Sequence, residues 1–365
     1  MNIEQVIQAY QVYERYPVRS HFRLRFGECA VRVGVSRLEV RDDLVRYFHE
    51  FTVPDGSADI DISIHQAPDF QVSETLATKP PDPGKTKIKE EFRDLDDGRI
   101  VRKRLTGMVF FFGRGKNIAI GPCIENLNQV VNFINNRYIE WLLCKGALLG
   151  HASGVAAGTT GLAIAGVSGA GKSTLALHLL ENGLDFISND RLIIEQNGER
   201  VVMHGVAKLP RINPGTALNS RVLRMLVPEK QRQRFEKLPP HELWKVENKY
   251  DVPIHTCYGP DRFVLSVNMS GLVILTWKPG TGDFIAEKVT TVDHRRKLMA
   301  AFMKPTGLFF YPGRTNHVSE ATVERYIRLL AGIDIWEFSG FADFEAAARF
   351  CLARIEEKRV QHETG

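Results

Sequence analysis

The sequence predicts an α/β protein of two parts, a mostly antiparallel α+β domain over residues 1–122 and a larger α/β domain over residues 123–365. The chain has 365 residues, which is enough for two domains or for one large domain with insertions. Its first third alternates apolar and polar residues as half-buried strands do, whereas helical spacing begins at Leu127. A glycine-rich turn between an apolar run and a run of helix formers then indicates a strand–loop–helix unit.

The first domain is predicted to begin with a helix over Met1–Arg15. Alternation predicts strands within Phe22–Val40, and the strict alternation of Asp59–Ile64 predicts a strand with one buried face. Glycine-containing turns then separate three predicted strands of an antiparallel meander, which are Arg99–Leu105, Met108–Phe112 and Asn117–Ile120.

The second domain is predicted to begin with a long amphipathic helix, because apolar residues recur at helical spacing from Leu127 to Leu142. The predicted strands that follow the glycine-rich turn are Leu184–Ser188, Leu192–Glu195, Arg200–Val206, the pair Phe263–Val267 and Leu272–Trp277, and Asp283–Thr290. The charged run at residues 229–234 is expected to be a solvated helix face. Three C-terminal helices are predicted over Val292–Met303, Glu320–Ala331 and Phe341–Glu356.

The glycine-rich turn matches the phosphate-binding pattern G-x-x-x-x-G-K-[ST]. It reads Gly166, Val167, Ser168, Gly169, Ala170, Gly171, Lys172 and Ser173, and Thr174 follows it. Glycines let consecutive backbone N–H groups point at one anion, and Lys172 and the following helix N-terminus add positive charge. The Ser173 hydroxyl is the expected Mg²⁺ ligand. A glycine turn that binds nothing is the alternative, but the apolar run before it and the helix formers after it favour a bound nucleoside triphosphate.

Two further polar residues are candidates for chemistry near this loop. The predicted strand Leu184–Ser188 runs into Asn189 and Asp190, and a carboxylate there is placed to hold a Mg²⁺-bound water or to accept a proton. Its structural alternative is a cap on the following turn. His151 precedes a predicted hairpin over Val155–Ala165, and this hairpin would bring His151 back near the glycine-rich loop. Spacing alone leaves a structural and a catalytic role for His151 equally open.

Composition limits the partners and the compartment. Hydrophobic residues at 44% and charged residues at 25% are ordinary globular values, and a net charge of +5 from dispersed residues argues against nucleic acid as a partner. Five scattered cysteines predict reduced thiols rather than disulfides or a zinc site. The N-terminus lacks a signal-peptide pattern and no run of 18 apolar residues occurs, so we expect a cytoplasmic protein that does not bind membranes.

The order of these motifs resembles a known family. An His151-Ala152-Ser153-Gly154 element, an apolar hairpin, the glycine-rich loop, a short helix ending at Gly183 and a strand ending in Ser188-Asn189-Asp190 look like the bacterial HPr serine kinase/phosphorylase catalytic domain. The similarity is greatest to the HprK-related kinase B family and covers roughly residues 126–206. It implies a fold like that of phosphoenolpyruvate carboxykinase, ATP and Mg²⁺ as cofactors, and γ-phosphoryl transfer to a serine of a protein.

The resemblance also implies roles for single residues. His151 would polarise or relay at the active site, Lys172 would clamp the phosphates, Ser173 would bind Mg²⁺, and Asp190 would be a metal ligand or a base. Two positions depart from the family. Asn189 stands where the family has a first aspartate, so that Asp190 serves alone or the phosphorylase activity is absent, and Thr174 replaces a glutamate beside the metal.

Positive charge for the transition state is expected from the segments that follow the strand-rich core. Lys208, Arg211 and Arg262 are candidates, and Arg211 is preferred because Lys208–Gly215 has the composition of a structured loop.

Three functions fit the sequence. The first is a kinase acting on a serine or threonine of a protein partner. The second is a small-molecule kinase that uses a polyol or sugar hydroxyl. The third is a non-catalytic ATP-binding regulatory module, which Asn189 and Thr174 would suit. The resemblance further suggests a homo-oligomer.

Overall fold

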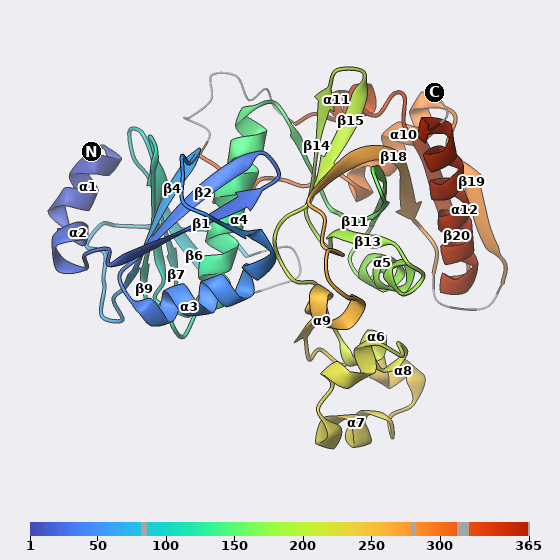
Figure 1. Cartoon of the computed structure of the whole chain (residues 1–365), viewed down its shortest axis with the longest axis horizontal. Coiled ribbons are helices and arrows are strands. Elements are labelled where there is room, and N and C mark those ends of the chain that lie inside the picture. The colour runs from blue at the N-terminus through green and yellow to red at the C-terminus, as the bar shows by residue number, and fades with distance from the viewer. Residues whose placement is uncertain (82–85, 279, 281, 312–320, 364–365) are drawn as a thin grey trace. The chain divides into compact units, whose positions relative to one another are not determined.

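The structure, a computed structural model, describes residues 1–81, 86–278, 280, 282–311 and 321–363. Within these residues the chain forms two compact units (Figure 1). The first contains Met1–Gly146 and a short return of the chain that begins at Thr306. The second contains Ala147–Pro305 and the C-terminal stretch. Each unit is built around a large sheet of its own.

The sheet of the first unit has nine strands among the described residues, in the order β3-β1-β2-β4-β9-β8-β7-β6-β5. The strands are β1 Ser20–Phe26, β2 Cys29–Val35, β3 Thr52–Val53, β4 Ile60–Gln66, β5 Ala77–Thr78, β6 Glu90–Asp94, β7 Arg99–Lys103, β8 Val109–Gly113 and β9 Lys116–Gly121. The predicted meander β7-β8-β9 is confirmed, and β4 alternates buried isoleucines with polar residues as predicted. Strand β4 nevertheless pairs in parallel with β2 and β9, so the sheet is mixed.

Two predictions for the first unit are wrong in detail. The predicted N-terminal helix is divided into α1 Ile3–Ala9 and α2 Val12–Arg15, because Gln11 adopts a left-handed conformation with φ of 49°. The strand pattern also ends at Val35, and Leu38–Tyr47 forms helix α3. Only Val40 and Leu44 of α3 are buried, a spacing of four that suits a helix lying on a sheet.

The predicted long helix exists as α4 Leu127–Cys144 and belongs to the first unit. The predicted boundary after residue 122 would have placed it in the second domain. Its apolar face packs on the first sheet instead, where Tyr138 meets Phe26 at 5.3 Å between ring centroids and Phe133 meets Phe110 at 4.9 Å. The returning chain completes this core with Phe309, whose ring lies 5.3 Å from that of Phe110.

The sheet of the second unit carries the candidate site. Its strands are β10 Leu148–Gly150, β11 Ala152–Ala157, β12 Thr160–Gly166, β13 Asp185–Ser188, β14 Leu192–Asn197, β15 Arg200–His204, β18 Ser266–Leu275, β19 Phe284–Lys288 and β20 Asp334–Gly340. The predicted hairpin is confirmed as the antiparallel pair β11–β12. The predicted strand pair within Phe263–Trp277 is wrong, because Gly271 lies inside the single strand β18 against Leu162 of β12 rather than in a turn. Strand β20, which the sequence patterns did not indicate, pairs with β18 in parallel.

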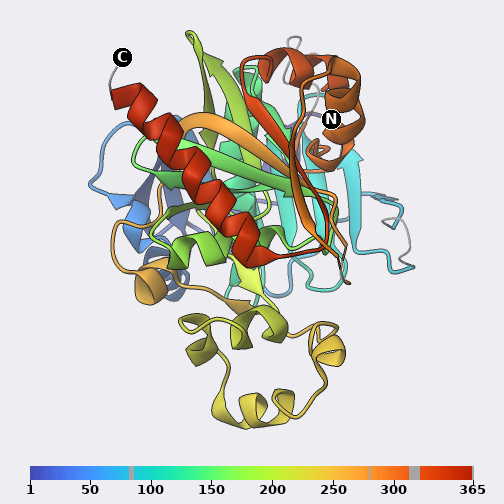
Figure 2. The same cartoon turned by 90° about the vertical axis from the view of Figure 1, so that its right-hand side faces the viewer.

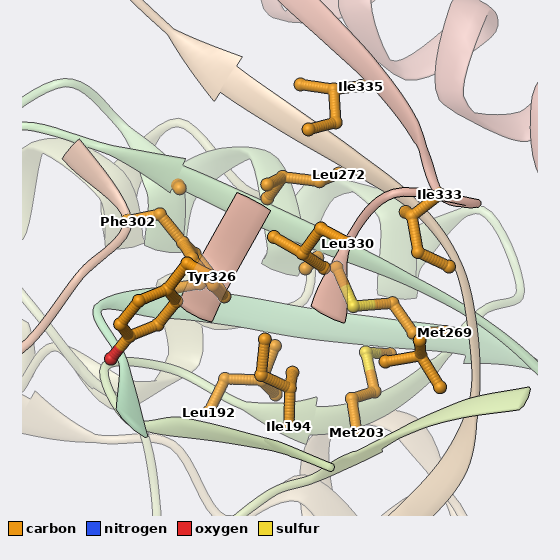
Figure 3. Close-up of a cluster of buried hydrophobic side chains, with 14 of the residues drawn as sticks. Leu192, Ile194, Met203, Met269, Leu272, Phe302, Tyr326, Leu330, Ile333 and Ile335 are labelled. Atoms are coloured by element: carbon orange, nitrogen blue, oxygen red, sulfur yellow. The ribbon is translucent and has the colours of Figure 1, made fainter. Parts of the chain in front are cut away.

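Helices cover both faces of this sheet (Figure 2). Helices α5 Lys172–Glu181 and α12 Phe344–Glu363 lie together on one face. Helices α10 Val292–Leu298 and α11 Val323–Leu329 pack on the other, over a core in which Leu272, Phe302 and Tyr326 meet (Figure 3). All three C-terminal helices were predicted, with different ends, and Glu320 lies outside the described residues.

A helical excursion, residues 211–258, leaves the second sheet and returns to it (Figure 2). Its neck is the strand pair β16 Arg211–Ile212 and β17 Tyr250–Asp251. The helices of the excursion are α6 Pro214–Leu218, α7 Glu229–Phe235, α8 Pro240–Leu243 and α9 Ile254–Tyr258. Apart from the buried Phe235, α7 is largely exposed, which confirms the predicted solvated face.

A close backbone contact fixes where the chain enters this excursion. A Cβ at Gly205 would lie 1.9 Å from the carbonyl oxygen of Ile187 in β13. Only glycine lets the two backbones approach so closely. The loop after Gly205 is therefore held against the end of β13, which is where Asp190 follows.

Replacing Gly205 by alanine is expected to destabilise the second unit by about 1–3 kcal/mol, because the loop has to move away from β13. Gly332→Ala is the matched control, since its Cβ would meet nothing within 4 Å and its φ lies outside the left-handed range. Calorimetric melting of both variants measures the difference. Equal melting temperatures of the two variants would show that the loop moves away from β13 without a loss of stability.

Candidate functional site

The glycine loop, Gly166–Ser173, connects the end of β12 to the start of α5. Gly166, Gly169 and Gly171 have φ of 151°, 84° and 92°, all within the range that favours glycine. A Cβ at Gly171 would also lie 2.7 Å from the Phe344 ring. Trp277 fixes the loop from the side, since its Nε1 donates to the Ala170 carbonyl at 2.7 Å. The loop is thus a rigid backbone turn at the N-terminus of a ten-residue helix.

Lys172 points back into this loop. Its Nζ donates to the carbonyl of Gly166 at 2.7 Å and to that of Val167 at 3.1 Å, and only 8% of the residue is exposed. Burial lowers the pKa of Lys172, and the nearby charge of Lys304 lowers it further, whereas the charge of Asp190 raises it. The ammonium is therefore positioned by the loop itself and lies within electrostatic reach of Asp190.

His151 is positioned by strand β10 and the core beneath it. Its backbone N–H donates to the Phe302 carbonyl at 2.6 Å. The carbonyl of Leu149, two residues before His151, accepts hydrogen bonds from the Tyr326 hydroxyl at 2.6 Å and from the Lys304 backbone N–H at 3.0 Å. Figure 3 shows Phe302 and Tyr326 side by side in this core, with ring centroids 5.9 Å apart. One packed cluster thus supports both His151 and Lys304.

Asp190 lies just beyond β13, between a histidine and a lysine. His151 Nε2 is 2.9 Å from its Oδ1, and Lys304 Nζ is 3.4 Å from its Oδ2. The turn is fixed by Ser153 Oγ, which donates to the Asn189 carbonyl at 2.7 Å. Desolvation would raise the pKa of Asp190, but the hydrogen bond with His151 and the charges of Lys304 and Arg191 outweigh it and hold the pKa well below its usual range. Asp190 is therefore a carboxylate at neutral pH.

Lys208 is the other perturbed group beside Asp190. Burial and the positive charges of Arg191 and Arg211 lower the pKa of Lys208 to about 8, against the opposing charges of Asp190 and Asp251. Burial likewise lowers the pKa of Arg191. Cations that repel one another in this way indicate a site arranged to receive an anion.

The structure brings together most of the predicted site residues. His151 contacts Asp190, and Lys172 lies within electrostatic reach of that carboxylate. Ser173 and Thr174 stand at the start of α5, where the Thr174 hydroxyl lies 3.1 Å from that of Thr216. Arg211 lies in the neck of the excursion, 3.2 Å from Asp251.

Two cations differ from the expectation. Arg262 pairs with Asp185 at 2.6 Å, at the opposite end of β13 from Asp190, so it has a structural role instead. Lys304 was missed, because it follows no motif and reaches Asp190 only through the packing of residues 299–304 under β10.

The donor atoms at this site suit Mg²⁺, which prefers oxygen ligands and keeps several waters. Asp190 offers a carboxylate, Ser173 a hydroxyl, and Asn189 a buried Oδ1 without a hydrogen-bond partner. Among the described residues, no cluster of three or more His, Cys, Asp or Glu side chains could hold a metal by itself. The chemistry of these donors therefore fits a magnesium ion that keeps several water ligands.

Two other expectations concern the whole chain. All five cysteines are free, and burial raises the pKa of Cys29 and Cys123 to about 12. In the described part of the chain, no helix combines the length and apolar character needed to cross a membrane.

Comparisons with known proteins give a distant structural likeness. No family model matches the chain, and no curated protein matches it. Among solved structures, the HPr(Ser) kinase/phosphatase from Coxiella burnetii is similar over 59% of this chain and 93% of its own, with 13% sequence identity and a TM-score of 0.30. At that level neither its fold nor its activity transfers to this chain.

Removing the Lys208 charge is expected to stabilise the second unit at pH 7 by about 1–3 kcal/mol, because each pKa unit of depression corresponds to about 1.4 kcal/mol. The Lys208→Met variant tests this. The folded pKa of about 8 lies below the ordinary 10.5, so the wild type binds fewer protons when folded and regains stability as pH rises from 8 to 10.5. Melting temperatures at pH 7 and 10.5, with exposed Lys230→Met as control, measure the effect. A Lys208→Met variant that melts at or below the wild-type temperature at pH 7 would contradict it.

Proposed function

We propose that this protein is an ATP-dependent phosphotransferase that moves the γ-phosphoryl group to a hydroxyl. The observation that carries the proposal is that Lys172 and Asp190 lie near each other. A buried lysine bound inside a glycine loop lies within electrostatic reach of a carboxylate that His151 and Lys304 hold from two sides. Five cations, Lys172, Arg191, Lys208, Arg211 and Lys304, surround two carboxylates here, which favours a polyanionic ligand.

Binding would use the loop as it stands. The backbone N–H groups of the glycine loop and the N-terminus of α5 favour an anion. Lys172 would exchange the Gly166 and Val167 carbonyls for β- and γ-phosphate oxygens, a stronger charge-assisted interaction. Ser173 and Asp190 would hold Mg²⁺, which when bound neutralises phosphate charge.

Transfer would take place at Asp190. The acceptor oxygen forms a bond to the γ-phosphorus, the bond from that phosphorus to the β–γ bridging oxygen breaks, and ADP leaves with the electron pair. The hydroxyl proton passes to the Asp190–His151 pair. The low pKa of Asp190 makes it a weak base, which suffices because phosphoryl transfer depends chiefly on positioning and charge.

The acceptor that we propose is a serine or threonine of a protein, in a kinase of the HprK-related B type. The order of motifs from His151 to Asp190 supports this assignment. Asn189 distinguishes the chain from a dual kinase/phosphorylase, because its amide cannot take up a proton and one carboxylate remains for acid–base work.

Lys172→Met is expected to weaken binding of Mg²⁺–ATP by about tenfold or more, because the phosphates lose a charged donor. Isothermal titration of the wild type, this variant and exposed Lys230→Met measures the change. Unchanged affinity in Lys172→Met would place the nucleotide elsewhere.

Asp190→Asn is expected to bind ATP but to transfer no phosphate, because the amide neither accepts the proton nor supplies charge to the metal. The test is transfer from γ-³²P-ATP in an extract of the source organism, with proteins and small molecules resolved separately. A labelled protein band that requires Asp190 supports a protein kinase, and label confined to a small molecule supports a polyol or sugar kinase. Binding without any transfer by the wild type would refute the proposal and favour a regulatory module.

A further inference from the structure

The loop from Gly205 to Arg211 is fixed beside the end of β13. Gly205 abuts the Ile187 carbonyl, and its N–H donates to the Leu265 carbonyl at 2.8 Å. Further along, the Lys208 N–H donates to the Val206 carbonyl at 2.7 Å, and the Pro210 carbonyl accepts from the Val252 N–H at 2.9 Å. Backbone contacts at both ends therefore determine where Lys208 stands.

The charges around Lys208 do not balance. Both nearby carboxylates have other partners, since Asp190 contacts His151 and Lys304 and Asp251 pairs with Arg211. Within the part of the chain that the structure describes, no carboxylate lies within ion-pairing distance of Lys208, while Arg191 and Arg211 act on it as like charges. Such an arrangement is unfavourable until an anion enters it.

This positive group is distinct from the one in the glycine loop. The charges that act on Lys172 are those of Asp190 and Lys304, whereas those that act on Lys208 are Arg191, Asp190, Arg211 and Asp251. Asp190 is the one residue common to both groups. A triphosphate held at Lys172 and a second anion held at Lys208 would therefore both lie beside Asp190.

We propose that Lys208, backed by Arg211, forms an anion subsite that binds a negatively charged group next to the acceptor's hydroxyl. The inference rests on the proposed phosphotransfer and names its substrate class, a hydroxyl flanked by a carboxylate or a phosphate. Anchoring that anion places the hydroxyl at Asp190, whereas a neutral acceptor has no such anchor. The same chemistry is offered by an acidic peptide and by a phosphorylated polyol.

The test measures whether a fluorescein-labelled peptide binds to protein loaded with Mg²⁺ and a non-hydrolysable ATP analogue. The peptide has one serine with a pair of aspartates on each side. Binding is followed by fluorescence anisotropy at about 0.15 M salt, because the salt screens nonspecific electrostatic attraction. The matched peptide carries asparagines, and glycerol phosphate is the competing small molecule. Lys208→Met, Lys208→Arg and the exposed control Lys230→Met are compared with the wild type.

We expect the acidic peptide or glycerol phosphate to bind the wild type, and Lys208→Met to weaken that binding about tenfold or more, with Lys208→Arg retaining it. Which probe binds identifies the source of the anion. Binding of neither probe, or equal binding by Lys208→Met, would overturn the subsite. Lys208-dependent binding in a protein that transfers no phosphate would keep the subsite and refute the phosphotransfer, so the two failures are distinguishable.

Discussion

The second unit is organised around the charge of a single carboxylate, that of Asp190. His151 and Lys304 hold its two oxygens, and the charges of the adjacent Arg191 and of Lys172 and Lys208 from two further segments also interact with it. The lysines and the arginine come from the glycine loop, the turn after β13, the loop after Gly205 and the segment just before Thr306, while His151 follows β10. Without Asp190 these positive charges would repel one another with only Asp251 to compensate them, and with it the cluster still carries excess positive charge.

The fold fixes this cluster through backbone contacts that tolerate little change. Gly171 lies against Phe344, Gly205 lies against Ile187, and Gly150 lies against the ring of Phe302. Each contact fixes the backbone on one side of the site, so the geometry of the sheet and the core sets where the cations lie. Stability is given up at such a site in exchange for an arrangement that is ready to bind an anion.

Local features were predictable from the sequence, whereas long-range pairing was not. The hairpin, the glycine loop and helix α4 were predicted because turn chemistry and periodicity act within a few residues. Strand β20 was missed because its partner β18 lies about sixty residues earlier in the chain. Two strands were predicted where the single strand β18 runs, and Gly271 between them packs closely against Leu162. Lys304 had no signal at all, since tertiary packing alone brings it to Asp190.

The most direct test of the central claim is hydrogen–deuterium exchange with and without Mg²⁺ and a non-hydrolysable ATP analogue. If the triphosphate binds at the junction of Lys172 and Asp190, the amides of Gly166–Leu175 and of residues 189–191 gain protection together. The excursion helix α7, which makes none of the site's contacts, should exchange as before. Protection confined to the first unit, or none in the glycine loop, would contradict the account.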